Sequence, residues 1–176
     1  MNHKEEQQRF TLSLLVNNHP GVLQRVVGLF SRRGYNIVSL SVGETSDCTI
    51  SRITIVVLGN RPIIKQIKNQ VEKLVDIIRV ELMEYKNSLE SELILVKLST
   101  INNKRSDVVE LGELFKARVL DVALETITLE LTGETSKIES FLILAKTYGI
   151  VEMSRTGITA LESGSIALRN KPYEEL

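Results

Sequence analysis

The sequence predicts an α+β protein built from two successive βαββαβ units. Short runs in which apolar and polar residues alternate are typical of strands, and such runs recur along the chain. Longer runs between them carry apolar residues at spacings of three and four, which is typical of helices packed on a core. Two segments of the first half return in the second half in the same order, which indicates an internal repeat.

The first unit begins with a strand in which Phe10, Leu12 and Leu14 alternate with polar residues. The elements expected in this unit are a strand at residues 10–14, a helix from residue 22, strands at 36–43 and 51–58, a helix from residue 61 and a strand at 77–84. Two right-handed crossovers in this order give a four-stranded antiparallel sheet with two helices on one face, which is a ferredoxin-like sandwich.

The first helix follows a turn of sequence Asn-Asn-His-Pro-Gly that ends at Gly21. Either Asn18 or His19 can cap this helix, and Pro20 suits its first turn. Gly34 is placed to end the helix in the left-handed conformation that glycine adopts at little cost.

The second unit repeats this order. "ITIVVLGN" from Ile53 recurs as "ITLELTGE" from Ile127, and "LFSRRGYNIVSL" from Leu29 recurs as "LFKARVLDVALE" from Leu114. The elements expected here are strands at 92–98, 118–123, 126–132 and 150–161 and helices at 106–115 and 136–147. We therefore expect a flexible N-terminus at 1–9, a first domain at 10–84, a linker at 85–91, a second domain at 92–162 and a mobile tail at 163–176.

Composition excludes several classes of function. Lysine and arginine together number 22, as do aspartate and glutamate, so no overall charge draws the protein to nucleic acid or to a membrane surface. Apolar stretches of membrane-spanning length and a secretory signal are missing from the sequence, and it has one cysteine, so we expect a cytoplasmic protein. With two histidines and one cysteine, neither a Cys/His zinc site nor a recognisable catalytic triad can be assembled.

The opening turn is the best candidate for a binding site. A helix start carries unpaired backbone N–H groups and a partial positive charge, so it attracts a carboxylate or a phosphate. Gly21 lets a ligand approach the backbone. Asn36 opens a strand that we expect to return near this turn, and its amide, like that of Asn18, offers both a donor and an acceptor. These residues also fit a plain capped turn, so spacing alone supports no more than a small-molecule site.

Other polar residues allow two interpretations each. His19 is either a solvated loop residue or a contact at the rim of a site. Arg25, Arg32 and Arg33 could contact phosphate, but the balanced charge of the chain favours a solvated helix end.

A family resemblance emerges from longer segments. "LLVNNHPGVLQRVVGLFSRRGYNIVSLSVGET", "SRITIVVLG" and "VEKLVDIIRVEL" closely resemble the small, regulatory subunits of acetolactate synthase, also called acetohydroxyacid synthase. In the second half the similarity continues through "ELILVKL", "ELFKARVLDV", "ITLELTG" and "SRTG". The resemblance covers nearly the whole chain outside its two ends.

The resemblance implies an ACT domain followed by an ACT-like domain. It also implies a homodimer formed through the first domain, with valine bound at that interface as the feedback effector. A separate large subunit would carry thiamine diphosphate, magnesium and FAD and condense pyruvate with pyruvate or 2-oxobutyrate in branched-chain amino-acid biosynthesis. The small subunit itself would hold no cofactor, activate the large subunit and make it sensitive to valine.

The resemblance also implies the effector residues: Asn18, Gly21, Val22, Leu23, Asn36 and Ile37. Backbone N–H groups of Gly21 to Leu23 would bind the carboxylate of valine, and the two asparagines would hold its polar end. The second repeat departs from this pattern, since its turn at 99–104 has no glycine and Asp121 replaces the second asparagine. That carboxylate would repel a ligand carboxylate, so we expect contacts with the large subunit there instead of a second site.

Two alternatives remain open at this stage. The chain could be a free-standing ACT-type amino-acid sensor that acts on a different partner. An organelle-encoded copy would place it in the plastid stroma, because such a copy carries no transit peptide.

Overall fold

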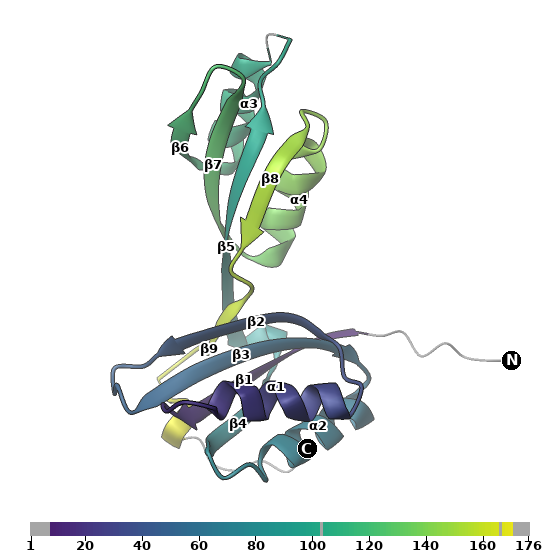
Figure 1. The fold of residues 1–176 in the computed structure, drawn as a ribbon, viewed down its shortest axis with the longest axis vertical. Coiled ribbons are helices and arrows are strands. Elements are labelled where there is room, and N and C mark those ends of the chain that lie inside the picture. The colour runs from purple at the N-terminus through teal and green to yellow at the C-terminus, as the bar shows by residue number, and fades with distance from the viewer. Residues whose placement is uncertain (1–7, 103, 166, 171–176) are drawn as a thin grey trace, which may run out of the picture. The chain divides into compact units, whose positions relative to one another are not determined.

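The computed structural model describes residues 8–102, 104–165 and 167–170, which form two compact units (Figure 1). The N-terminal unit contains the chain up to Leu89 together with the residues from Thr159 onward. The C-terminal unit is continuous and runs from Glu90 to Ile158. Among the described residues, none of the helices is long and apolar enough to cross a membrane.

The N-terminal unit has the predicted βαββαβ order. Its elements are β1 (Gln8–Asn17), α1 (Val22–Arg32), β2 (Ile37–Glu44), β3 (Ile50–Gly59), α2 (Arg61–Val71) and β4 (Ile77–Met83). The strands form an antiparallel sheet in the order β2-β3-β1-β4, so β2 and β4 are its edges. The ferredoxin-like fold predicted from periodicity is confirmed for this unit.

Both helices of this unit lie on one face of its sheet (Figure 1). Alternate residues of the strands point into the layer between sheet and helices, where they meet the apolar faces of α1 and α2. The core residues that are at most 1% exposed are Leu12, Leu14, Val26, Phe30, Ile53, Ile55, Val57, Ile64, Ile67, Val71 and Val80. Burial of these apolar side chains fixes the register of the sheet, because a slip of one residue would expose them.

Gly34 ends α1 as predicted. It has φ of +70°, and its N–H donates to Ser31 O at 3.1 Å. The next N–H, of Tyr35, donates to Phe30 O at 3.0 Å. This pair of bonds is a Schellman motif, which satisfies carbonyl groups that the last helical turn would otherwise leave unpaired.

The opposite face of the same sheet is covered by the end of the chain. We call residues 159–165 and 167–170 the strap; it contains β9 (Thr159–Glu162) and the short helix η2 (Leu168–Asn170). Arg52 Nη1 of β3 donates to Ser13 Oγ at 3.0 Å and to Ala160 O at 3.3 Å. Leu168 is 4% exposed and packs against Leu15 and Ile50. The strap is therefore part of the N-terminal fold.

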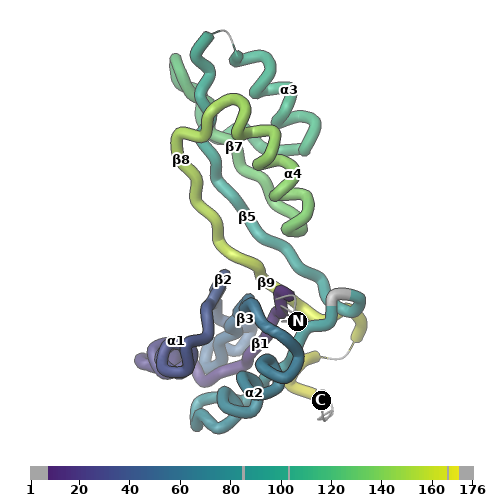
Figure 2. The backbone as a smooth tube through the Cα atoms, turned by 90° about the vertical axis from the view of Figure 1, so that its right-hand side faces the viewer, coloured from purple at the N-terminus to yellow at the C-terminus, as the bar shows by residue number. Residues whose placement is uncertain are grey.

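The C-terminal unit repeats the architecture. After η1 (Tyr85–Asn87), its elements are β5 (Ser88–Ser99), α3 (Arg105–Phe115), β6 (Arg118–Val122), β7 (Thr126–Gly133), α4 (Thr135–Ala145) and β8 (Ile150–Arg155). The strand order is β6-β7-β5-β8. Figure 2 shows α3 and α4 on the same side of β5, β7 and β8. Phe141 of α4 is fully buried, and its ring meets that of Phe115 at a centroid distance of 5.4 Å.

Two expected boundaries differ from the structure. The strand expected at 150–161 is divided into β8 and β9, because Gly157 between them has φ of +79°, which a continuous strand does not allow. Residues 159–162, expected in the second domain, belong to the N-terminal unit. Of the tail expected at 163–176, the described part includes η2 and the buried Leu168, while 171–176 lie outside the described residues.

The expected linker and the expected flexible N-terminus both overlap strands of the structure. Within the expected linker 85–91, β5 already begins at Ser88 after the three residues of η1. Of the N-terminus expected to be flexible at 1–9, residues 8 and 9 begin β1, and residues 1–7 lie outside the described residues.

Candidate functional site

The turn between β1 and α1 presents backbone donors at the start of a helix. Gly21 precedes the helix with φ of +88° and ψ of −12°, and no side chain caps the helix there. The N–H of Val22 makes a long bond of 3.4 Å to His19 O. The N–H groups of Gly21 and Leu23 have no hydrogen-bond partner among the described residues. This helix start therefore suits an anionic group.

Neither Asn18 nor His19 caps α1, so both capping options are wrong. The Asn18 side-chain Nδ2 donates to Glu44 Oε1, at the end of β2, at 3.0 Å, and to Cys48 O, between β2 and β3, at 2.8 Å. Both amide hydrogens are therefore used within the chain. What Asn18 can offer a ligand is its carboxamide oxygen, which accepts hydrogen bonds and suits an ammonium group.

A buried carboxylate lies behind this turn. Asp76, directly before β4, has a side chain 6% exposed; its Oδ1 is 2.8 Å from His19 Nε2, and its Oδ2 accepts from Arg25 Nε at 2.6 Å. Burial alone would raise the pKa of Asp76, but hydrogen bonds and charge from Arg25, and then from His19, outweigh burial and lower the pKa. His19 is thus a half-exposed loop residue, as one interpretation expected, and its ring is held in place by Asp76.

Sequence reasoning missed Asp76 as a member of the site. The residue lies more than fifty positions from His19 and Arg25, so no local spacing connects them. One signal was available: a carboxylate interrupts the apolar run "LVDII" at the start of a strand. A charge inside such a run needs a partner, because burial of an unpaired carboxylate is costly.

The apolar site residues are available to different degrees. The Val22 side chain is 4% exposed and belongs to the core, so this residue can offer a ligand only its backbone. Leu23 is 41% exposed and projects its side chain at the turn. Ile37 is partly buried and packs against the core at the start of β2.

Asn36 does not lie near this turn in the same chain, and that expectation is wrong. Through β3, Ile37 aligns with Phe10 at the start of β1, whereas Glu44 aligns with Val16 at its end. Asn36 and the turn that holds Asn18 are therefore separated by the length of β2, about 25 Å for eight residues. The reason is the path of the chain. Helix α1 begins beside the end of β1 and runs back along the sheet, so β2 begins level with the start of β1.

Strand β2 is an exposed edge. It pairs with β3 on one side, and no described strand pairs with its other side. Val38 and Val42 on this strand are 38% and 47% exposed. An unpaired edge with exposed valines is a template for the addition of another strand.

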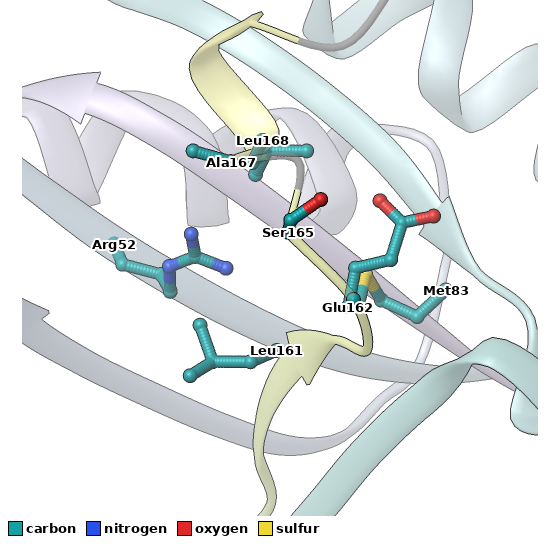
Figure 3. Close-up of a pocket in the computed structure, with 8 residues that line it drawn as sticks. Arg52, Met83, Leu161, Glu162, Ser165, Ala167 and Leu168 are labelled. Atoms are coloured by element: carbon teal, nitrogen blue, oxygen red, sulfur yellow. The ribbon is translucent and has the colours of Figure 1, made fainter.

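A cavity of about 270 Å³ lies between the strap and the sheet (Figure 3). Its walls include Arg52 and Met83 of the sheet and Leu161 of the strap. None of the six predicted effector residues lines it. Arg52 donates to Ser13 Oγ in the sheet and to Ala160 O in the strap, so this arginine already joins the strap to the sheet.

The corresponding turn of the C-terminal unit is built differently. Lys104 precedes α3 without a capping side-chain bond, and Arg105 Nη2 donates to Ala123 O and Leu124 O at 2.7 and 2.8 Å. Asp121 lies on the exposed strand β6. The glycine of the first turn is therefore not repeated, and Asp121 stands where the first unit has Asn36.

Two family models match the chain, one in each half. Residues 12–79 match the model of the AHAS small subunit-like ACT domain, and residues 91–164 match the model of the small subunit of acetolactate synthase. The chain belongs to the acetolactate synthase small-subunit family. The acetolactate synthase small subunit of Mycobacterium leprae is 47% identical over 154 residues, which are 88% of this chain and 91% of that protein.

Other members of the acetolactate synthase small-subunit family are similarly close. The small subunit of Buchnera aphidicola is 41% identical over 157 residues, covering 89% of this chain and 99% of that protein. The crystal structure of the small subunit from Thermotoga maritima superimposes with a TM-score of 0.83 at 35% identity, covering 90% of this chain and 99% of that chain. The resemblance recognised from sequence is confirmed, and with it the ACT-type fold and a place in branched-chain amino-acid biosynthesis.

Proposed function

We propose that this chain is the regulatory subunit of acetolactate synthase, which activates a separate catalytic subunit and makes it subject to feedback inhibition by valine. Family membership and the small-subunit relatives support the regulatory role. The catalytic subunit would convert two pyruvates to 2-acetolactate and CO2, with thiamine diphosphate, magnesium and FAD bound there. This chain would contribute no group to that reaction.

The valine site in this proposal is shared between two copies of the chain. If β2 pairs antiparallel with β2 of a second copy about a two-fold axis, Ile37 faces Glu44 of the partner subunit. The start of one β2 then lies at the end of the other. Asn36 of one chain is thereby brought beside Asn18 of the other, because Asn18 is bonded to Glu44. This pairing resolves the separation of the two asparagines within one chain.

The turn residues match the three parts of a free amino acid. Unpaired N–H groups of Gly21 and Leu23 suit the carboxylate. The Asn18 carboxamide oxygen and the Glu44 carboxylate, which lie together, suit the ammonium group. The exposed Leu23 side chain offers an apolar contact for the isopropyl group, with Ile37 of the partner subunit completing it.

The energies suit a reversible sensor. A sensor that responds between about 10 μM and 1 mM needs about 4 to 7 kcal/mol of binding free energy. Burial of the valine side chain supplies about 1.5 to 3 kcal/mol, and each charge-assisted hydrogen bond about 1.5 to 3 kcal/mol. Immobilisation costs at least about 4 kcal/mol. Two or three good polar contacts are therefore sufficient.

The test is reconstitution with the large subunit. Acetolactate formation is measured with the large subunit alone, with this chain added, and with both plus increasing valine. The proposal expects activation by this chain and inhibition by valine, since valine must bind one state of the complex more tightly than the other. Absence of both effects would refute it, and valine binding without any effect on the large subunit would favour a free-standing sensor.

A further inference from the structure

Arg25 lies against the backbone of the effector turn. Its own N–H donates to Gly21 O at 3.0 Å, one helical turn back. Its guanidinium also reaches this glycine: Nη1 is 3.4 Å from the point that a Cβ on Gly21 would occupy. The side chain is 48% exposed, so the guanidinium borders both the turn and solvent.

The orientation of Arg25 is fixed by Asp76. The Nε of Arg25 donates to Asp76 Oδ2 at 2.6 Å, and Asp76 is itself held by His19 through its other oxygen. Because Asp76 is buried, this contact is not free to exchange with water. The guanidinium plane is thereby held before any ligand arrives, which reduces the entropy lost on binding.

Two nitrogens of Arg25 remain available. Neither Nη1 nor Nη2 has a hydrogen-bond partner among the described residues. A guanidinium with only its Nε engaged still presents the Nη hydrogens, which can form paired bonds with both oxygens of a carboxylate. The unpaired N–H groups of Gly21 and Leu23 lie at the same helix start.

We propose that Arg25, positioned by Asp76, is a further effector-binding residue whose guanidinium binds the carboxylate of the amino acid. The inference rests on the proposed function of this turn as the amino-acid site. It adds a charged side chain to a carboxylate contact that otherwise consists of backbone N–H groups. Asp76 is a positioning residue in this arrangement, because it acts on the ligand only through Arg25.

The test compares valine with valinamide, in which a neutral amide replaces the carboxylate. Binding of both to the purified chain is measured by calorimetry for the wild type, Arg25→Gln and the control Arg32→Gln. Arg32 is exposed in the last turn of the same helix. The wild type and Arg32→Gln should prefer valine by about tenfold or more, as expected for a charge-assisted paired contact. Arg25→Gln should lose most of this preference, with the remainder due to the backbone N–H groups, while its affinity for valinamide stays unchanged.

Two further variants separate binding from folding. Arg25→Lys keeps the positive charge but cannot form the paired hydrogen bonds of a guanidinium. Its preference for valine over valinamide should therefore fall between those of the wild type and Arg25→Gln. If Arg25→Gln does not fold by circular dichroism, the same comparison is made with Arg25→Lys alone. Asp76→Asn should reduce the preference for valine without abolishing valinamide binding, because the guanidinium loses its anchor.

The outcomes distinguish this inference from the proposed function. If the wild type binds neither ligand, the amino-acid site itself is refuted. If the wild type binds valine and Arg25→Gln keeps the wild-type preference, Arg25 is not a carboxylate contact, while the amino-acid site stands. Equal affinity of the wild type for valine and valinamide would also overturn the role of Arg25.

Discussion

Asn18 and Glu44 are joined by a hydrogen bond of 3.0 Å between the side-chain amide and Oε1. This bond ties the turn before α1 to the last residue of β2, although the two residues lie 26 positions apart. A displacement of the β2 edge therefore acts directly on the candidate effector turn. Strand pairing along β2 and binding at the turn are accordingly expected to be coupled.

A site shared between two chains can be tested by complementation. Asn18→Ala and Asn36→Ala should each weaken valine binding in a homodimer by about tenfold, the effect of one lost polar contact. A mixed dimer of the two variants, purified through two different affinity tags, should regain one site of wild-type affinity per dimer. One of its two sites then combines intact Asn18 with intact Asn36. Calorimetric stoichiometry distinguishes this result from a site within one chain, for which the mixed dimer would contain no intact site.

Val42→Lys should weaken self-association of the chain. A lysine on an edge strand opposes strand addition, and the substitution removes an apolar contact that each of two copies would bury. We expect the dimer dissociation constant, measured by sedimentation equilibrium, to rise by about tenfold or more. Val75→Lys is the matched control, because Val75 is 93% exposed and lies outside β2. Identical dissociation constants for the two variants would exclude β2 from the interface.

Asp76 should stabilise the fold in a pH-dependent manner. Its pKa is lowered in the folded chain, so its contribution is fully present above the unfolded-state pKa of about 3.9. The contribution is lost as the pH falls from that value through the lower folded-state pKa. Asp76→Asn should therefore lower the Tm at pH 7, and the difference from wild type should shrink toward pH 3. Asp121→Asn, on the exposed strand β6, is the control and should change the Tm little at any pH. A Tm difference between Asp76→Asn and wild type that did not change with pH would contradict this prediction.

Phe141→Ala should strongly destabilise the C-terminal unit. The ring is fully buried and packs on Phe115, so truncation leaves a cavity and should cost about 3 to 5 kcal/mol of unfolding free energy. Ile143→Ala, two residues further along α4 and 66% exposed, should cost no more than about 0.5 kcal/mol. Urea unfolding followed by circular dichroism measures both, and similar losses for the two variants would contradict the assigned faces of α4.

Most of the fold could be predicted from sequence because apolar periodicity records which face of each element is buried. Leu12 and Leu14 alternate with Ser13, and the alternation alone predicts a strand with one face on the core. Gly34 was predictable as the end of α1, since few other residues adopt its positive φ.

The remaining features depend on contacts between residues far apart in the chain. The separation of Asn36 from Asn18 follows from the register of three strands, which local patterns do not record. Pairing of Asp76 with Arg25 likewise requires the segment between α2 and β4 to lie against the first turn of α1. The strap could not be foreseen either, because Gly157 fits a bend inside one strand as well as a break between two.

The strap also determines when the N-terminal unit can be completed during synthesis. Ala160 and Leu168 are buried on the sheet face opposite the helices, and they leave the ribosome after the whole C-terminal unit. At elongation rates of about 5 to 20 residues per second, the seventy residues or so of that unit delay the strap by several seconds. Through that interval the N-terminal unit exposes Leu15 and Ile50 on an open sheet, so we expect the nascent chain to need more protection from aggregation than the folded chain.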